Sequence, residues 1–108
     1  MAKMDLPQGT LDLLVLRVLD AGKMHGWGMV QRLGLLSKGA LQLQEGTLYP
    51  ALYRMEAKGW IKPEWGLTEH NRRAKYYQLT AIGRKRLAAE KQDWDRLSEV
   101  VAAVMKEA

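Results

Sequence analysis

Apolar residues recur at helical spacing near the start of the chain. Between Thr10 and Gly22 they follow intervals of three and four residues, the pattern of an amphipathic helix; they are Leu11, Leu14, Val15, Val18 and Leu19. We expect Thr10 to cap the start of this helix and Gly22 to end it. Leu13 and Leu16 lie outside the stripe. A second side of the helix is therefore apolar and needs a covering element, which a second subunit would supply.

The same spacing continues between His25 and Ser37 and predicts a second helix there. Its apolar stripe consists of Met29, Leu33 and Leu36. Its three glycines each cost about 1 kcal/mol relative to Ala in a helix interior, but their small size favours the close approach of a neighbouring helix. We interpret His25 as a capping or packing residue rather than a ligand.

The segment EGTLYPALYRMEAKG predicts a third helix that starts at Gly46 or Thr47 and is ended by Gly59. One face carries the apolar residues Leu48, Leu52 and Met55, whereas Tyr49, Tyr53 and Arg54 point elsewhere. Pro50 fits a helix if it falls in the first turn, where its missing N–H would have no partner.

Alternating residues predict strands in the remaining central segments. Leu41 and Leu43 alternate with glutamines, which is typical of a very short strand. Trp60, Ile61 and Trp65 favour a longer strand, and Pro63 within it indicates an edge position. Residues 74–79 favour its partner because two tyrosines raise the β propensity. The polar segment between the two strands is typical of an exposed hairpin tip.

A long helix is predicted from Thr80, its N-cap, to about Lys106. Such a helix would be roughly 40 Å long. Its apolar residues follow a heptad-like spacing, at Leu87, Trp94, Leu97, Val101 and Val104. A helix of this length extends beyond so small a core, which indicates that a partner covers its apolar side.

The order of these elements is that of a winged helix: a mainly α fold with a small β-hairpin and a long C-terminal helix. We expect residues 1–80 to form a winged helix-turn-helix DNA-binding domain and residues 81–108 to form a dimerisation helix. In this architecture the third helix enters the major groove, and the hairpin, or wing, reaches the DNA backbone or the minor groove.

The distribution of charge along the chain indicates what kind of partner this fold binds. The 108-residue chain has a formal net charge of +5. Residues 54–86 carry nine Lys or Arg against three Glu, whereas the rest of the chain carries eight basic and nine acidic residues. A localised basic block is expected for a polyanion partner, although charge alone also fits a solubilising surface. Its overlap with the predicted wing favours nucleic acid.

Four segments resemble the PadR family of bacterial transcriptional regulators in order and spacing: GTLDLLVLRVL, MHGWGMVQRL, EGTLYPALYRMEAKGWI and RRAKYYQLTAIGRKRL. The resemblance implies a winged helix whose C-terminal helix packs on the partner's N-terminal region in a two-fold dimer. It also implies a short form of the family, without a longer helical C-terminal domain. We expect the dimer interface to include Leu13, Leu16, Leu87, Trp94, Leu97, Val101 and Val104.

The resemblance further implies which residues approach DNA. Thr47, Tyr49 and Pro50 occupy the start of the recognition helix, and Arg54 lies one turn further on. Arg72, Arg73 and Lys75 match the basic wing, whereas Tyr76 and Tyr77 are interpreted as structural. Two alternatives stay open: Tyr49 donates to DNA or packs beneath the helix, and Arg54 reaches a phosphate or is merely exposed to solvent.

Members of this family are often repressors that small aromatic molecules release. In some, a tryptophan of the C-terminal helix stacks such a ligand against its symmetry mate. Trp94 is the residue here that would do so, and the alternative is that it fills the dimer core. Trp27, Trp60 and Trp65 are interpreted as core or strand residues.

Other functional classes receive little support from the sequence. The chain has no cysteine, which excludes disulfides and thiolate metal sites and fits a reducing cytoplasm. The N-terminus lacks the apolar run of a signal peptide, and no apolar run approaches the roughly 20 residues of a membrane span. The two histidines, His25 and His70, are isolated, and no catalytic motif is present. We therefore expect a cytoplasmic, non-enzymatic protein without a cofactor or metal. A winged helix that binds protein or RNA is the alternative.

Overall fold

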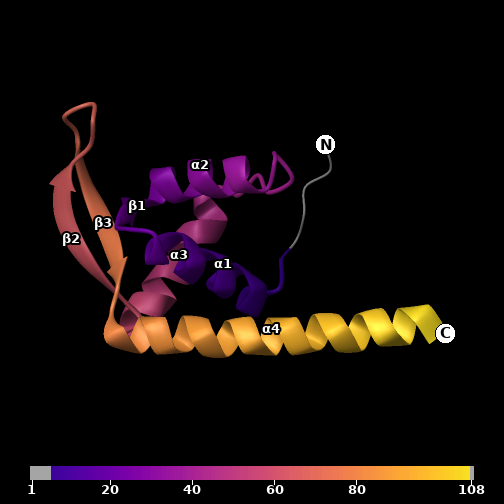
Figure 1. The fold of residues 1–108 in the computed structure, drawn as a ribbon. Coiled ribbons are helices and arrows are strands. Elements are labelled where there is room, and N and C mark those ends of the chain that lie inside the picture. Colours follow the sequence, from indigo (N-terminus) through magenta and orange to yellow (C-terminus); the bar gives the residue numbers. More distant parts are fainter. Residues whose placement is uncertain (1–5, 108) are drawn as a thin grey trace.

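The computed structural model describes residues 6–107, which form four helices and a small antiparallel sheet (Figure 1). The elements are α1 (Gln8–Asp20), β1 (Met24–His25), α2 (Gly26–Leu36), α3 (Glu45–Ala57), β2 (Ile61–Leu67), β3 (Arg73–Leu79) and α4 (Ala81–Glu107). The winged helix with a long C-terminal helix, predicted from the sequence, is confirmed.

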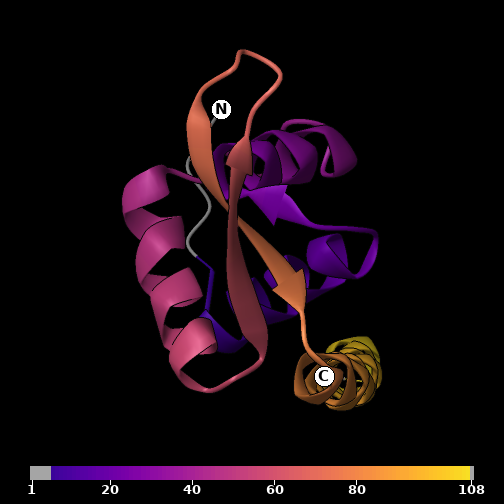
Figure 2. The ribbon, with the colours of Figure 1, turned by 90° about the vertical axis from the view of Figure 1, so that its left-hand side faces the viewer.

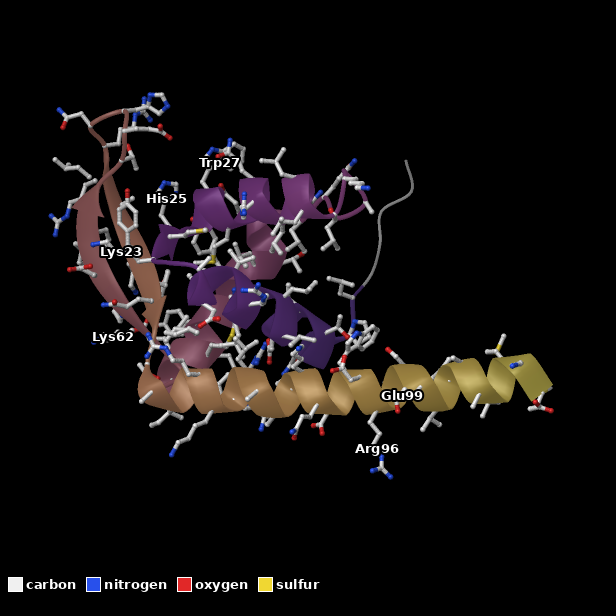
Figure 3. The ribbon with its side chains drawn as sticks, viewed as in Figure 1. Lys23, His25, Trp27, Lys62, Arg96 and Glu99 are labelled. Atoms are coloured by element: carbon white, nitrogen blue, oxygen red, sulfur yellow. The ribbon has the colours of Figure 1, made fainter. Side chains whose placement is uncertain are left out.

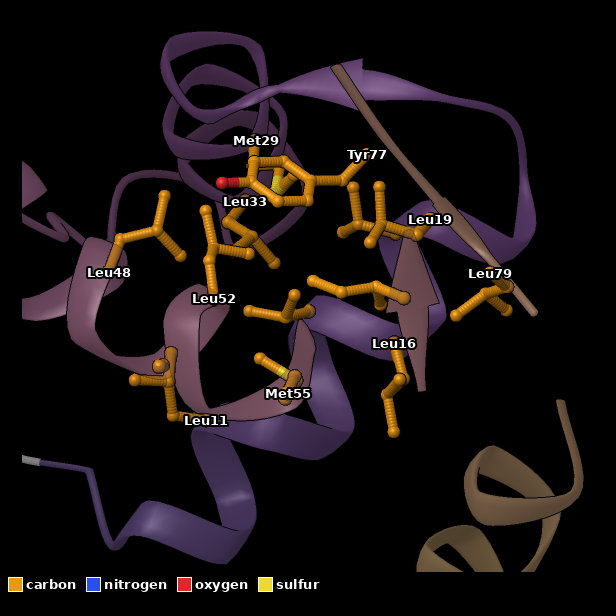
Figure 4. Close-up of a cluster of buried hydrophobic side chains, with 14 residues drawn as sticks. Leu11, Leu16, Leu19, Met29, Leu33, Leu48, Leu52, Met55, Tyr77 and Leu79 are labelled. Carbon is orange, nitrogen blue, oxygen red and sulfur yellow. The ribbon is translucent and has the colours of Figure 1, made fainter. Parts of the chain in front are cut away.

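The hydrophobic core lies where α1, α2 and α3 meet the lower half of the hairpin (Figure 4). Its completely or almost completely buried side chains include Val15, Leu16, Met29, Leu48, Leu52, Met55 and Ile61. Most of these residues belong to the predicted helical stripes. Leu16, however, was expected at the dimer interface. That prediction is wrong, because the side chain is fully buried within its own chain and covered by the chain's own elements.

The boundaries of α1 and α2 agree closely with the sequence pattern, with one exception. α1 begins at Gln8 and follows Pro7 without a side-chain cap, so the predicted Thr10 cap is wrong. α2 is capped by His25, whose Nδ1 accepts a hydrogen bond from the Gly28 N–H at 3.0 Å. The interpretation of His25 as a capping residue is thus confirmed.

α3 starts one residue earlier than predicted, and this moves Pro50 out of the first turn. Pro50 is the sixth residue of the helix. Its missing N–H removes the bond that the carbonyl of Gly46 would otherwise accept. The start of α3 therefore presents a backbone carbonyl without its usual helical partner. The helix ends at Ala57, and Gly59 follows with a φ of 76°, as its predicted role in ending the helix requires.

The sheet has the strand order β1–β3–β2, so β2 with Pro63 is an edge strand, as predicted. The third strand was predicted in the wrong place. Leu41 and Leu43 lie in irregular chain, and the extra strand is instead the two-residue β1, which pairs with Tyr76 and Tyr77 of β3. The alternation reflects a buried Leu41 and a half-buried Leu43 that are each followed by an exposed glutamine, rather than strand pairing.

The hairpin of β2 and β3, which we call the wing, extends beyond the core and ends in a tip over residues 68–72 (Figure 1). The hydroxyl of Thr68 accepts hydrogen bonds from the N–H groups of His70 and Arg72 at 3.2 and 3.1 Å. Asn71 adopts a φ of 60°, a conformation that asparagine tolerates better than most residues. Tyr76 donates its hydroxyl to the carbonyl of Leu67 at 2.9 Å, which ties the two strands together.

α4 follows β3 after a single residue, Thr80, and passes under α1 before it continues past the rest of the molecule (Figures 1 and 2). The Thr80 hydroxyl accepts from the Gly83 N–H at 3.0 Å, so the predicted N-cap is confirmed. No helix within residues 6–107 is both long and apolar enough to cross a membrane.

Candidate nucleic-acid interface

A groove of about 910 Å³ separates the wing from the starts of α2 and α3. We call it the wing groove. Figure 2 shows the wing in front, with α3 on one side and α2 on the other. Its lining includes four aromatic and three cationic side chains besides two histidines. The lining residues that the argument uses are His25, Gly26, Trp27, Tyr49, Trp65, Glu69, His70, Arg72, Arg73, Lys75 and Tyr77.

Strand alternation places the basic wing residues on the groove side. Side chains of β3 point alternately to opposite faces, and Tyr77 and Leu79 are buried on the inner face. Arg73 and Lys75 share that face. Arg73 lies over the indole of the paired strand's Trp65, with its guanidinium carbon 4.8 Å from the ring centroid. The wing therefore presents a cation supported by an aromatic ring, and Arg72 is exposed beside it.

Lys75 connects the wing to α3. Its ammonium lies 3.3 Å from a carboxylate oxygen of Glu56. Partial burial acts to lower the pKa of Lys75, but the hydrogen bond to Glu56 and the nearby Tyr77 outweigh it, so that the pKa is raised. Lys75 is therefore a charged residue that steadies the wing against α3 and still lines the wing groove.

Tyr49 forms the α3 side of the groove, and its ring packs against the first residue of α2. A Cβ added to Gly26 would lie 2.7 Å from the Tyr49 hydroxyl oxygen, so the contact depends on the glycine. The side chain is 44% exposed. Burial raises the pKa of the Tyr49 hydroxyl above its ordinary value, with smaller contributions from Glu45 and Tyr77. Tyr49 thus packs between helices and still offers a protonated hydroxyl to the groove.

Thr47 and Pro50 are exposed on the first half of α3, and Tyr53 in its second half has 78% of its surface exposed. Arg54 behaves differently from its neighbours. Its Nη1 and Nη2 atoms donate to the two carboxylate oxygens of Asp12 at 2.8 and 2.7 Å. Asp12 is only 4% exposed. The prediction that Arg54 reaches a phosphate is therefore wrong, because this two-bond contact with α1 holds the guanidinium. The same contact raises the pKa of Arg54.

The structure also brings two residues to the groove that sequence reasoning did not assign to DNA. His25 lines it from the start of α2, and Trp27, expected in the core or a strand, is 53% exposed in the first turn of that helix. Both point toward the end of the molecule that carries the wing tip (Figure 3). The sequence held only a weak signal for a role of these residues in DNA binding. They are a capping histidine and a tryptophan at the start of a helix that otherwise contributes to the core.

The predicted dimer residues lie elsewhere in the molecule. Leu87 is half-buried against the core, and Leu13 is partly exposed on α1. Further along the same side of α4, four residues are between 47% and 58% exposed: Trp94, Leu97, Val101 and Val104. We call these four the α4 seam. Within residues 6–107, no group of three or more His, Cys, Asp or Glu is arranged to hold a metal ion.

Comparison with known proteins agrees with this arrangement. The pattern of the family described as "Transcriptional regulator PadR-like family" matches residues 15–89. Transcriptional regulator Rv3488 of Mycobacterium tuberculosis is 27% identical over 97 residues, which cover 90% of this chain and 87% of the relative.

Solved structures show the same likeness. A transcriptional regulator from Clostridium thermocellum is 27% identical, with a TM-score of 0.81 and coverage of 89% of this chain and 93% of that chain. A PadR family transcription regulator from Clostridium difficile is 30% identical, with a TM-score of 0.76 and coverage of 88% of this chain and 97% of that chain. Because the family pattern spans well over half of the sequence, the chain belongs to the PadR-like family of transcriptional regulators.

Proposed function

We propose that this regulator is a dimeric repressor whose DNA surface consists of the start of α3 and the basic side of the wing. The observation that carries the proposal is the wing groove, where Arg72, Arg73 and Lys75 face Tyr49 and Glu69 is the acidic lining residue. Thr47 and Pro50 extend the surface along α3. Phosphate contacts from the wing would position the protein, and the exposed side of α3 would read base edges.

In this proposal residues 1–80 bind DNA, and residues 81–108 pair two subunits through the α4 seam. Two-fold pairing presents two recognition helices about one DNA turn apart, roughly 34 Å, and therefore requires an inverted-repeat operator. Exposed Leu97, Val101 and Val104 support the pairing, because a contiguous apolar face on a soluble helix usually marks an interface. Trp94 lies at this seam, where a small aromatic ligand would stack between the subunits and release the repressor.

The test is a fluorescence-anisotropy titration with the DNA upstream of the protein's own gene, at two salt concentrations. Arg72→Ala/Arg73→Ala should weaken binding and reduce the slope of log affinity against log salt by about two, because two phosphate contacts are lost. Lys91→Ala/Arg96→Ala removes the same charge from exposed positions on α4 and should leave the slope unchanged.

The outcomes separate the proposal from its alternative. Equal affinity for the upstream DNA and for random duplex would contradict an operator-specific repressor. Preferential binding of RNA, or unchanged DNA binding by the wing variant, would favour a winged-helix module for another partner.

A further inference from the structure

The positions of α3 and the wing determine which part of the DNA lies over the wing groove. If α3 occupies a major groove and the wing reaches the adjacent minor groove, the sugar–phosphate strand between them must cross the space between α3 and the wing. That space is the wing groove; Figure 2 shows the wing in front of α3 and α2. Its cationic lining matches a phosphodiester chain, so charge complementarity agrees with the topology.

The far wall of this space is the start of α2, and the capping bond there fixes the chemistry of His25. Nδ1 accepts from the Gly28 N–H at 3.0 Å, so it carries no proton in this arrangement. A neutral imidazole then carries its proton on Nε2, which makes that atom a hydrogen-bond donor.

The ring of His25 is also held in place. It stands edge-on to Tyr76 of the wing, with centroids 5.1 Å apart and planes at 68°. A Cβ added to Gly28 would lie 3.4 Å from the Cε1 atom of His25, so the helix backbone lies close against the ring. A donor that is already oriented loses little conformational entropy when it binds a phosphate oxygen.

Trp27 lies beside His25, and 53% of its surface is exposed although it is large and apolar. Its indole offers an N–H donor and a flat apolar surface, which suit a phosphate oxygen and a deoxyribose respectively. Trp65 and Arg73 form the opposite wall on the wing.

We propose that the sugar–phosphate strand between the two DNA grooves binds in the wing groove, where His25 donates its Nε2–H to a phosphate and Trp27 packs against the adjoining sugar. This inference rests on the proposed DNA-binding function. It adds two DNA-contacting residues at the start of α2, which carry no charge in this arrangement. Unlike the basic wing residues, they should contribute to affinity without contributing to its salt dependence.

His25→Asn separates capping from DNA binding. Asparagine is among the best N-cap residues, so the variant should keep its cap and its melting temperature. The shorter side chain lacks the Nε2–H donor. We expect affinity to fall about tenfold for operator and random duplex alike. The salt slope should stay at the wild-type value because a neutral donor releases no counterion.

Trp27→Leu provides a second variant at an exposed position and should lower affinity in the same way, without a change in salt slope. If wild type binds DNA and both variants bind equally well, the inference is overturned while the proposed function stands. A lower salt slope in His25→Asn would also overturn it, since His25 would then act as a cation. If wild type binds no DNA, both proposals fail.

Discussion

Arg54 and Arg73 are both arginines of the basic central segment, but their neighbours give them different roles. Arg73 lies over Trp65 at the groove, whereas Arg54 is held by the nearly buried Asp12 of α1. The acid that neutralises Arg54 is 42 residues away in sequence. Local charge density predicts a basic surface, but the tertiary partners decide which cations are free to meet a phosphate.

The Asp12–Arg54 pair should stabilise the fold rather than contact DNA. Arg54→Met would leave the Asp12 carboxylate almost buried without its partner, and we expect the free energy of unfolding to fall by about 3 kcal/mol. Urea denaturation measures this loss. The double variant Asp12→Leu/Arg54→Met should recover most of it, because no unpaired charge remains. A loss below about 1 kcal/mol in the single variant would show that the pair behaves as an exposed one.

At the scale of elements, the joint between the wing and α4 depends on Thr80 and Gly83. Thr80 donates to the carbonyl of Gly59 at 2.6 Å while it caps α4. Gly83, the second residue after Ala81, lies so close to the preceding turn that an added Cβ would be 2.0 Å from the carbonyl oxygen of Trp60. The start of α4 therefore rests directly on the chain that enters β2.

Gly83→Ala should destabilise the protein, although alanine is the better helix former. The contact is with backbone rather than a flexible side chain, so α4 must shift, at a cost of about 1–3 kcal/mol. Gly46→Ala in α3 is the matched control: its Cβ would meet nothing within 4 Å, and the variant should be neutral or more stable. Thermal unfolding compares the two. Equal melting temperatures would contradict the close packing described for Gly83.

The sequence predicted elements well where a long stripe and a terminal glycine or cap agreed. All four helices and the wing were found in this way; the start of α4 was predicted correctly, and the other starts were misplaced by one to three residues. The two-residue β1 was missed because so short a strand has no period of its own and exists only through its pairing with Tyr76 and Tyr77. The basic residues of the wing could be predicted from their charge and their position in the hairpin. His25 and Trp27 could not be predicted to line the groove, because only the packing of α2 beside the wing places them there.

At the scale of the whole molecule, the apolar side of α4 that packs on α1 continues without cover beyond it. Leu87 is partly buried, and the α4 seam follows at the same helical spacing. Principal extents of 55 × 35 × 21 Å reflect this projecting helix. The fold thus leaves its most elongated element with an apolar surface of the kind that a second copy would cover.

Leu97→Arg should prevent dimerisation, because a charge would be buried at the centre of the α4 seam. Sedimentation equilibrium should report a monomer that keeps its helical circular dichroism and binds a single half-site weakly. Gln92→Arg adds the same charge to an exposed position on the opposite side of α4 and should remain dimeric. A dimeric Leu97→Arg variant would place the subunit interface elsewhere.

The single residue between β3 and α4 has a consequence for how the proposed dimer would bind its two half-sites. Because only Thr80 separates β3 from α4, each wing is rigidly attached to α4, the helix that we propose pairs with a second subunit. Over roughly 40 Å of helix, a rotation of about 5° displaces the far end by about 3.5 Å, close to the rise of one base pair. We therefore expect affinity to depend on the spacing of the two half-sites. An operator whose half-sites are moved apart by one base pair should bind more weakly in the same anisotropy titration. Equal binding would show that the chain bends at Thr80.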